Sequence, residues 1–131
     1  MIAAAWSRFA TARVARLATV AVDGTPHVVP IVFAVDGDTI YSAVDGKPKR
    51  SRQLRRLANI AAQPRVSVLV DQYDEDWSRL WWVRADGAAT VHDSSPAARE
   101  LLAAKYPQYS GVPLDGPFLH IAVARWSDWS A

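Results

Sequence analysis

The sequence predicts one mainly β domain, built from six antiparallel strands and a few helices. Two Asp-Gly pairs, at 23–24 and 36–37, each separate two apolar segments rich in β-branched residues, which is the pattern of β-hairpins. No helical pattern stands between the strands of these hairpins, as a parallel nucleotide-binding sheet would require. Half of the 131 residues are hydrophobic, which suffices for one core, so we expect residues 1–131 to form a single domain.

The N-terminal half is expected to begin with a helix over residues 2–11 that packs Trp6 and Phe9. The hairpin strands are expected at 14–22, 27–35 and 39–44. Because the second of these strands is almost wholly apolar, we expect it to be buried on both faces. Pro30 within it cannot donate a hydrogen bond to a neighbouring strand. The strand is therefore either bulged or unpaired there, with backbone groups free for a ligand, or it lies at a sheet edge.

In the second half, apolar residues at helical spacing predict a helix over 51–62 with Arg55 and Arg56 turned outward. The apolar stripe consists of Leu54, Leu57 and Ile60. Three more strands are expected at 66–70, at 80–92 with a bulge at 86–87, and at 120–126. Trp81 and Trp82 point to opposite faces of a regular strand, so only one of them can belong to the core.

A third helix is expected from Pro96 to about Tyr106, because Ser95 followed by proline is a typical helix start and Pro107 ends the pattern.

The strongest charge cluster lies where the strand at 39–44 leads into the helix at 51–62. Its cations are Lys47, Lys49, Arg50 and Arg52, and Ser51 is the residue that starts the helix. Cationic side chains beside the free N–H groups of a helix start make a site for phosphate or carboxylate. A solvated basic helix start without a ligand is the alternative. We favour a binding site because ligands of mixed folds gather at such junctions.

Several classes of function lack their sequence patterns here. The chain has no cysteines, no glycine-rich dinucleotide or Walker loop, and no serine in a nucleophile elbow. His27, His92 and His120 lack metal-ligand spacing, and the acidic segment 71–76 does not match an EF-hand, so no metal site is predicted. A catalytic role would therefore depend on a bound cofactor.

The net charge of +2 is too small for a general polyanion binder, and the tryptophans are not interleaved with the basic cluster. We therefore expect no nucleic-acid partner. Arg8 and Arg13 interrupt the N-terminal apolar stretch, and no apolar run approaches the ~20 residues of a membrane helix. A cytoplasmic protein without a membrane partner is expected.

Residues 15–33 form a hairpin pattern, residues 39–54 a strand that enters a basic helix start, and residues 63–70 a strand that begins Gln-Pro-Arg-Val. In this order they resemble the pyridoxamine-phosphate-oxidase-like split β-barrel family, and the resemblance covers nearly the whole chain. Within the family the chain looks most like the actinobacterial branch that depends on the deazaflavin coenzyme F420, and residues 73–87 are similar to one subgroup of that branch. The resemblance implies a six-stranded antiparallel split β-barrel, the flavin-binding split barrel, that forms a homodimer with cofactors at the subunit interface.

The resemblance also implies which residues bind the cofactor. One strand would lie along the flavin-like ring, a second would flank it, and the basic cluster would hold the phosphate and the acidic tail of the cofactor. Two residues of the other subunit, Trp82 and Arg84, would close the groove. The implied cofactor-binding residues are Val29, Pro30, Ile31, Tyr41, Ser42, Ala43, Lys47, Lys49, Arg50, Ser51, Arg52, Trp82 and Arg84.

By the same resemblance, the activity would be F420-dependent oxidoreduction, in which the reduced deazaflavin transfers hydride from its C5 to a small conjugated electrophile. No residue stands out as catalytic; Tyr73, Tyr109 and His27 are candidate proton donors, and solvent is the alternative. Two other functions fit the family: a protein that binds flavin mononucleotide (FMN) or a tetrapyrrole, and a non-catalytic cofactor-binding module. The chain lacks the longer C-terminal region of the FMN oxidases, so oxidation of pyridoxamine phosphate is not expected.

Overall fold

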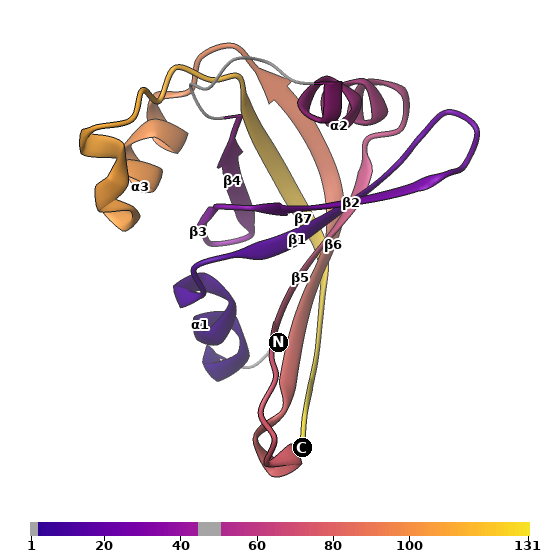
Figure 1. Cartoon of the computed structure of the whole chain (residues 1–131), viewed down its shortest axis with the longest axis vertical. Coiled ribbons are helices and arrows are strands. Elements are labelled where there is room, and N and C mark those ends of the chain that lie inside the picture. Colours follow the sequence, from indigo (N-terminus) through magenta and orange to yellow (C-terminus); the bar gives the residue numbers. More distant parts are fainter. Residues whose placement is uncertain (1–2, 45–50) are drawn as a thin grey trace.

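The computed structural model describes residues 3–44 and 51–131, and for residues 51–54 it describes the backbone alone. The helices are α1 (Ala3–Thr11), α2 (Ser51–Ala62) and α3 (Pro96–Lys105), with short 3-10 helices η1 (Trp77–Arg79) and η2 (Pro107–Ser110). The strands are β1 (Ala15–Val20), β2 (Pro26–Ile31), β3 (Ala34–Asp36), β4 (Thr39–Ala43), β5 (Arg65–Gln72), β6 (Trp81–His92) and β7 (Phe118–Ser130). Figure 1 shows one strongly curved sheet with the three α-helices around it.

All the strands belong to one antiparallel sheet in the order β2-β1-β5-β6-β7-β4-β3. The two edge strands, β2 and β3, are consecutive in the chain and are separated only by Val32 and Phe33. A connection this short requires the two sheet edges to lie close together, so the sheet curls into a partly closed barrel. We call residues 32–33 the strand switch.

The prediction of one strand over 27–35 is wrong, because the strand switch divides this segment. The chain pairs with β1 up to Ile31 and with β4 from Ala34, so the segment forms two strands and the sheet has seven strands, not six. Both predicted hairpins are present, but they occupy opposite edges of the sheet. The apolar run continues through the change of partner, so the periodicity of side chains gave no sign of it.

The expectation that this segment is buried on both faces is wrong for β2. From Pro26 to Pro30 its side chains alternate between exposed and partly buried, with Val28 61% exposed, and only Ile31 at its end is buried. The strand lies at the sheet edge, with Pro30 opposite Arg16 of β1. Of the two interpretations of Pro30, the edge strand is therefore the one that the structure confirms, because an edge needs no further donor.

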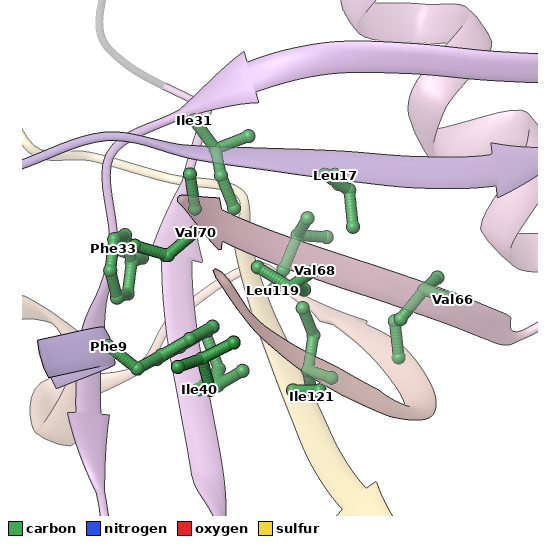
Figure 2. Close-up of a cluster of buried hydrophobic side chains, with 14 of the residues drawn as sticks. Phe9, Leu17, Ile31, Phe33, Ile40, Val66, Val68, Val70, Leu119 and Ile121 are labelled. Atoms are coloured by element: carbon green, nitrogen blue, oxygen red, sulfur yellow. The ribbon is translucent and has the colours of Figure 1, made fainter. Parts of the chain in front are cut away.

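The main core fills the inside of the curved sheet. Figure 2 shows Leu17 of β1, Val68 of β5 and Ile121 of β7 directed into the same apolar cluster. Helix α1 contributes Phe9, whose ring lies 5.2 Å from that of Phe33. This aromatic contact packs α1 directly against the strand switch.

A second, smaller core lies between α3 and the β3–β4 hairpin and includes Leu102, Tyr106 and Phe118. Helix α3 starts as predicted, because Ser95 accepts a hydrogen bond of 3.2 Å from the N–H of Ala98 and Pro96 follows it. Because its buried side chains belong to this second core, α3 covers the outer surface of β4 rather than the barrel interior.

Strands β5, β6 and β7 continue beyond the barrel as a narrow arm, at the bottom of Figure 1. The register between β6 and β7 shifts between Asp86 and Gly87, where a bulge was predicted, but the extra residue is Ala124 of β7 rather than a residue of β6. On the arm, Trp81 packs against the main core, whereas Trp82 lies on the outer face with Arg84, so these neighbouring tryptophans do point to opposite faces. None of the helices in the described ranges is both long enough and apolar enough to cross a membrane.

Candidate functional site

A cavity of about 290 Å³ lies at the meeting point of the two sheet edges. Its walls come from the end of β2, the strand switch, the end of β4 and helix α2. The lining residues are Val14, Pro30, Ile31, Val32, Ala43, Val44 and Arg56. We call this space the switch cavity. Three residues of the predicted cofactor site, Pro30, Ile31 and Ala43, meet in it although they come from different strands.

The other predicted residues of these two strands face elsewhere. Val29 packs against the main core, to which Ile31 also belongs. Ser42 is fully buried and points away from Ala43, because side chains alternate along a strand. The hydroxyl of Ser42 donates a hydrogen bond of 2.7 Å to the carbonyl oxygen of Val32. Tyr41 packs in the second core, with its ring centroid 4.9 Å from that of His120. Ser42 therefore supports the cavity wall from behind without lining it.

The basic cluster is only partly described. Lys47, Lys49 and Arg50 lie outside the described residues, and the backbone of Ser51 and Arg52 forms the predicted start of α2. Arg56 lines the switch cavity and is partly buried, which corrects the expectation that it faces outward. The sequence contained a signal for this position. Arg56 follows Arg52, a predicted site residue, by four positions, and residues four apart lie on the same face of a helix.

Trp82 and Arg84 lie far from the switch cavity of the same chain. The register places Pro30 opposite Arg16, Arg16 opposite Leu69, and Leu69 opposite Arg84, so three strand spacings separate Pro30 from Arg84. Trp82 and Arg84 line a different, shallow hollow of about 270 Å³ together with Leu69 and Asp71.

The arginine of this hollow is held in one orientation. The Nε atom of Arg84 donates to both carboxylate oxygens of Asp86, at 3.1 and 3.2 Å, and the guanidinium lies 5.7 Å from the centroid of a Trp82 ring. Asp86 also accepts a hydrogen bond of 2.6 Å from the hydroxyl of Ser67. A fixed planar cation beside an aromatic ring can stack on a planar ligand.

The outer face of the sheet carries a hollow of about 600 Å³ with many small residues in its lining. Its small lining residues include Ala18, Gly87, Ala88, Ala122 and Ala124, and the lining also contains Arg65 and Asp86. Val20 of β1, which lines the hollow, and Val28 of β2 are exposed. A face with small residues in its hollow and exposed valines offers apolar surface to a partner of complementary shape.

Each of the three candidate proton donors lies outside the described lining of the switch cavity. His27 lines another hollow, of about 490 Å³, together with Arg55 and Asn59. Tyr73 is 64% exposed on the arm and accepts a hydrogen bond of 3.4 Å from the indole N–H of Trp77. Tyr109 packs beside the ring of Tyr106.

Two histidines that sequence reasoning treated as unrelated lie in contact. The rings of His92 and His120 stack with centroids 3.9 Å apart, and His120 Nε2 lies 2.7 Å from the hydroxyl of Ser95. Burial, and to a smaller extent the neighbouring His92, lowers the pKa of His120 below its usual value. Within the described ranges, no three His, Asp or Glu side chains gather as a metal site would require.

The acidic loop at 71–76 forms bonds within itself and to its own neighbours. Asp74 accepts a hydrogen bond of 2.7 Å from the N–H of Asp76, and Asp76 accepts one of 3.1 Å from the N–H of Ser78. The guanidinium of Arg79 lies within 4.0 Å of the carboxylates of Asp74 and Asp76. These contacts fold the tip of the arm, and they give its carboxylates local partners.

Comparisons with solved structures identify the fold. A conserved hypothetical protein of Mycobacterium tuberculosis is 22% identical, with a TM-score of 0.74 over 99% of this chain and 85% of that one. A structure described as the FAD binding protein of Mycobacterium smegmatis is 19% identical, with a TM-score of 0.66 over 98% of this chain and 95% of that one. The heme storage protein HutZ of Vibrio cholerae is 15% identical, with a TM-score of 0.64 over 90% and 85%.

No curated protein sequence matches the chain significantly. Its sequence does match the family described as pyridoxamine 5'-phosphate oxidase over residues 2–130. The expected split-barrel fold is thereby confirmed, with seven strands in place of six. Because the match spans nearly the whole chain, the protein belongs to the pyridoxamine 5'-phosphate oxidase family.

Proposed function

We propose that the protein is a coenzyme F420-dependent oxidoreductase that binds the deazaflavin ring in the switch cavity and reduces a small conjugated electrophile. The observation that carries the proposal is the composition of that cavity. Apolar residues of both sheet edges form its walls, and Arg56 is its cation. Apolar walls suit a flat aromatic ring, and a guanidinium suits a phosphate.

The residues of the cavity divide the work of binding. Pro30 fixes its own backbone angle and Ala43 has a small side chain, so both let a planar ring approach the strands closely. Arg56 would hold the phosphate together with Lys47, Lys49, Arg50 and Arg52, which the sequence places just before it. The bound coenzyme supplies a hydride at C5, and the chain orients the ring and excludes water from one of its faces.

The source of a proton for the product follows from the same geometry. Tyr73, Tyr109 and His27 are not among the described residues that line the switch cavity. Solvent is therefore the proton source that we propose, since the cavity is open and a water molecule can reach its mouth.

The proposal includes a homodimer. The switch cavity, at about 290 Å³, is slightly smaller than the ~300–1,000 Å³ typical of small-molecule sites, so a second wall is needed to enclose a flavin-sized ring. Trp82 and Arg84, three strand spacings away, can reach such a ring only from another copy. The outer face, whose hollow is lined largely by small and apolar residues, is the surface that a two-fold dimer would bury.

A second candidate function is binding of FMN, FAD or a tetrapyrrole, with or without turnover. It is favoured by the similarity of the fold to an FAD binding protein and to a heme storage protein. Both kinds of ligand are planar and acidic, so the apolar walls and the cation of the switch cavity suit them as well.

The test is a titration of the purified protein with coenzyme F420 and, separately, with FMN, followed by quenching of tryptophan fluorescence. We expect F420 to bind more tightly, and Arg56→Gln to weaken its binding about tenfold or more. Arg55→Gln is the matched control, because Arg55 is the next residue of the same helix but lines a different hollow. Preference for FMN would favour the second candidate, and equal effects of the two substitutions would argue against the switch cavity as the site.

A further inference from the structure

The backbone of the strand switch is held by side chains from distant parts of the chain. Phe33 is fully buried between two strands. Its N–H donates a hydrogen bond of 3.1 Å to the hydroxyl of Tyr106, and its carbonyl oxygen accepts one of 2.9 Å from Nζ of Lys105. Buried backbone N–H and C=O groups need hydrogen-bond partners. For Phe33 these partners are the side chains of Lys105 and Tyr106, in place of the backbone of a neighbouring strand.

The hydroxyl of Tyr106 also acts as a donor. Its oxygen lies 3.0 Å from the carbonyl oxygen of Phe33 and 3.0 Å from that of Arg13, so its one proton is shared between these two acceptors. Burial raises the pKa of Tyr106 above its usual value, so the hydroxyl keeps this proton at neutral pH. A single hydroxyl therefore ties the strand switch to the segment that enters β1.

Three further contacts hold this hydroxyl and the amine of Lys105 in place. The amine lies 3.8 Å from the centroid of the Phe33 ring. The guanidinium of Arg13 lies 4.6 Å from the centroid of the Tyr106 ring and donates a hydrogen bond of 2.9 Å to the carbonyl oxygen of Lys105. The arrangement is reciprocal, because Arg13 and Tyr106 each bind the backbone of the other's segment.

We propose that Tyr106, assisted by Lys105, is a positioning residue for the switch cavity: it sets where Ile31 and Val32 stand and thereby how well the cavity receives a ring. The inference rests on the proposed function, in which this cavity binds the cofactor. Phe33 follows Val32 directly, and the carbonyl oxygen of Val32 accepts a hydrogen bond from the hydroxyl of Ser42. The wall of the cavity is thus fixed by two side chains that do not line it.

Coupling between α3 and the ligand follows by thermodynamic linkage. If Tyr106 favours the arrangement of the wall that binds the ring, the bound ring must in turn favour the docked state of Tyr106. No described residue of α3 lines the switch cavity, so a ligand has no direct contact with this helix through that lining. Slower hydrogen exchange of the α3 backbone when a ligand binds would therefore show that the cavity and α3 are coupled through Phe33.

The test compares Tyr106→Phe and Lys105→Met with the wild type. Hydrogen exchange of the backbone amides at 31–34 is measured without ligand, and the dissociation constants for F420 and FMN are measured by fluorescence. We expect Tyr106→Phe to raise exchange at Phe33 and to weaken binding of the preferred ligand roughly five- to tenfold, with a smaller effect for Lys105→Met. Tyr73→Phe, which removes an exposed hydroxyl on the arm, should change neither quantity.

Leu102→Ala separates positioning from stability, because Leu102 is buried on α3 but makes none of the hydrogen bonds to Phe33. An equal loss of affinity in Leu102→Ala and Tyr106→Phe would overturn the inference, as would unchanged affinity in Tyr106→Phe. Absence of F420 and FMN binding in the wild type would instead remove the proposed function. The exchange data then decide alone: faster exchange at Phe33 in Tyr106→Phe supports the positioning role, and unchanged exchange overturns it.

Discussion

The imidazole rings of His92 and His120 stack at a centroid distance of 3.9 Å with an angle of 24° between their planes. One ring comes from the end of β6 and the other from β7, and His120 also meets the hydroxyl of Ser95 at the start of α3. The neighbouring His92 makes a positive charge on His120 less favourable. The stack therefore links the docking of α3 to the protonation state of the protein.

A first prediction concerns pH. Because the folded-state pKa of His120 is lowered from 6.5, the unfolded chain binds more protons than the folded chain at and below about that pH. The contribution of His120 to stability is thus present above about pH 6.5 and is lost as the pH falls through the folded-state pKa. We expect urea unfolding midpoints to fall between about pH 7.5 and about pH 5, and His120→Asn to reduce that fall. An identical pH dependence in the variant would contradict the prediction.

A second prediction concerns Gly87 of β6, at the register shift between β6 and β7. A Cβ atom on Gly87 would lie 2.2 Å from the carbonyl oxygen of Ala122, so the neighbouring backbone would have to move. We expect Gly87→Ala to lower the free energy of unfolding by about 1–3 kcal/mol. Gly111→Ala is the control, because no heavy atom lies within 4 Å of its added Cβ and its φ is not positive. Urea denaturation of both variants measures the difference.

A third prediction concerns the packing of α1. Phe9 is fully buried and makes edge-to-face contacts with Phe33 and Trp126, at centroid distances of 5.2 and 5.0 Å. Its replacement by alanine should cost about 3–5 kcal/mol of unfolding free energy, because a large cavity remains. Trp77→Ala, at a side chain 68% exposed on the arm, should change stability by less than about 0.5 kcal/mol. Similar losses in the two variants would show that α1 is not part of the core.

A fourth prediction tests the proposed dimer. Ala88 is exposed in the lining of the outer hollow, so Ala88→Arg adds a long cation there without disturbing the core. We expect the wild type to elute as a dimer and the variant as a folded monomer in size-exclusion chromatography with light scattering. Ala103→Arg, on the exposed side of α3, should leave the dimer intact. A monomeric wild type would remove the proposed interface.

Much of the secondary structure could be predicted from local signals. The Asp-Gly turns located both hairpins, and the positive φ of Gly24 and Gly37 shows why glycine occupies them. Ser95 with Pro96 located the start of α3, and alternation along β6 assigned Trp81 and Trp82 to opposite faces. Each of these signals depends on a few neighbouring residues, which is why it could be interpreted without the fold.

The candidate site could be predicted only in part. Pro30, Ile31 and Ala43, which the resemblance to the family implied as cofactor-binding residues, come together in the switch cavity, and their binding role stays a prediction. Arg56 was assigned to the wrong side of its helix, and Tyr106 and Lys105 were not considered at all. A tyrosine after a helix is an ordinary core residue in a sequence, and nothing local shows that its hydroxyl will meet a backbone amide 73 residues away.

The sequence by itself determined the types of the elements, the turns between them and the family, because these follow from short-range periodicity, from turn chemistry and from the order of a few segments. Only the tertiary structure decided that one apolar run is divided at residues 32–33 between the two edges of the sheet. Only the tertiary structure, too, brought the side chains of Tyr106, Lys105 and Ser42 into hydrogen bonds with the backbone of residues 32–33. The physical reason is that strand pairing and buried hydrogen bonds join residues distant in the chain, and a strand's own periodicity is the same whichever partner it has.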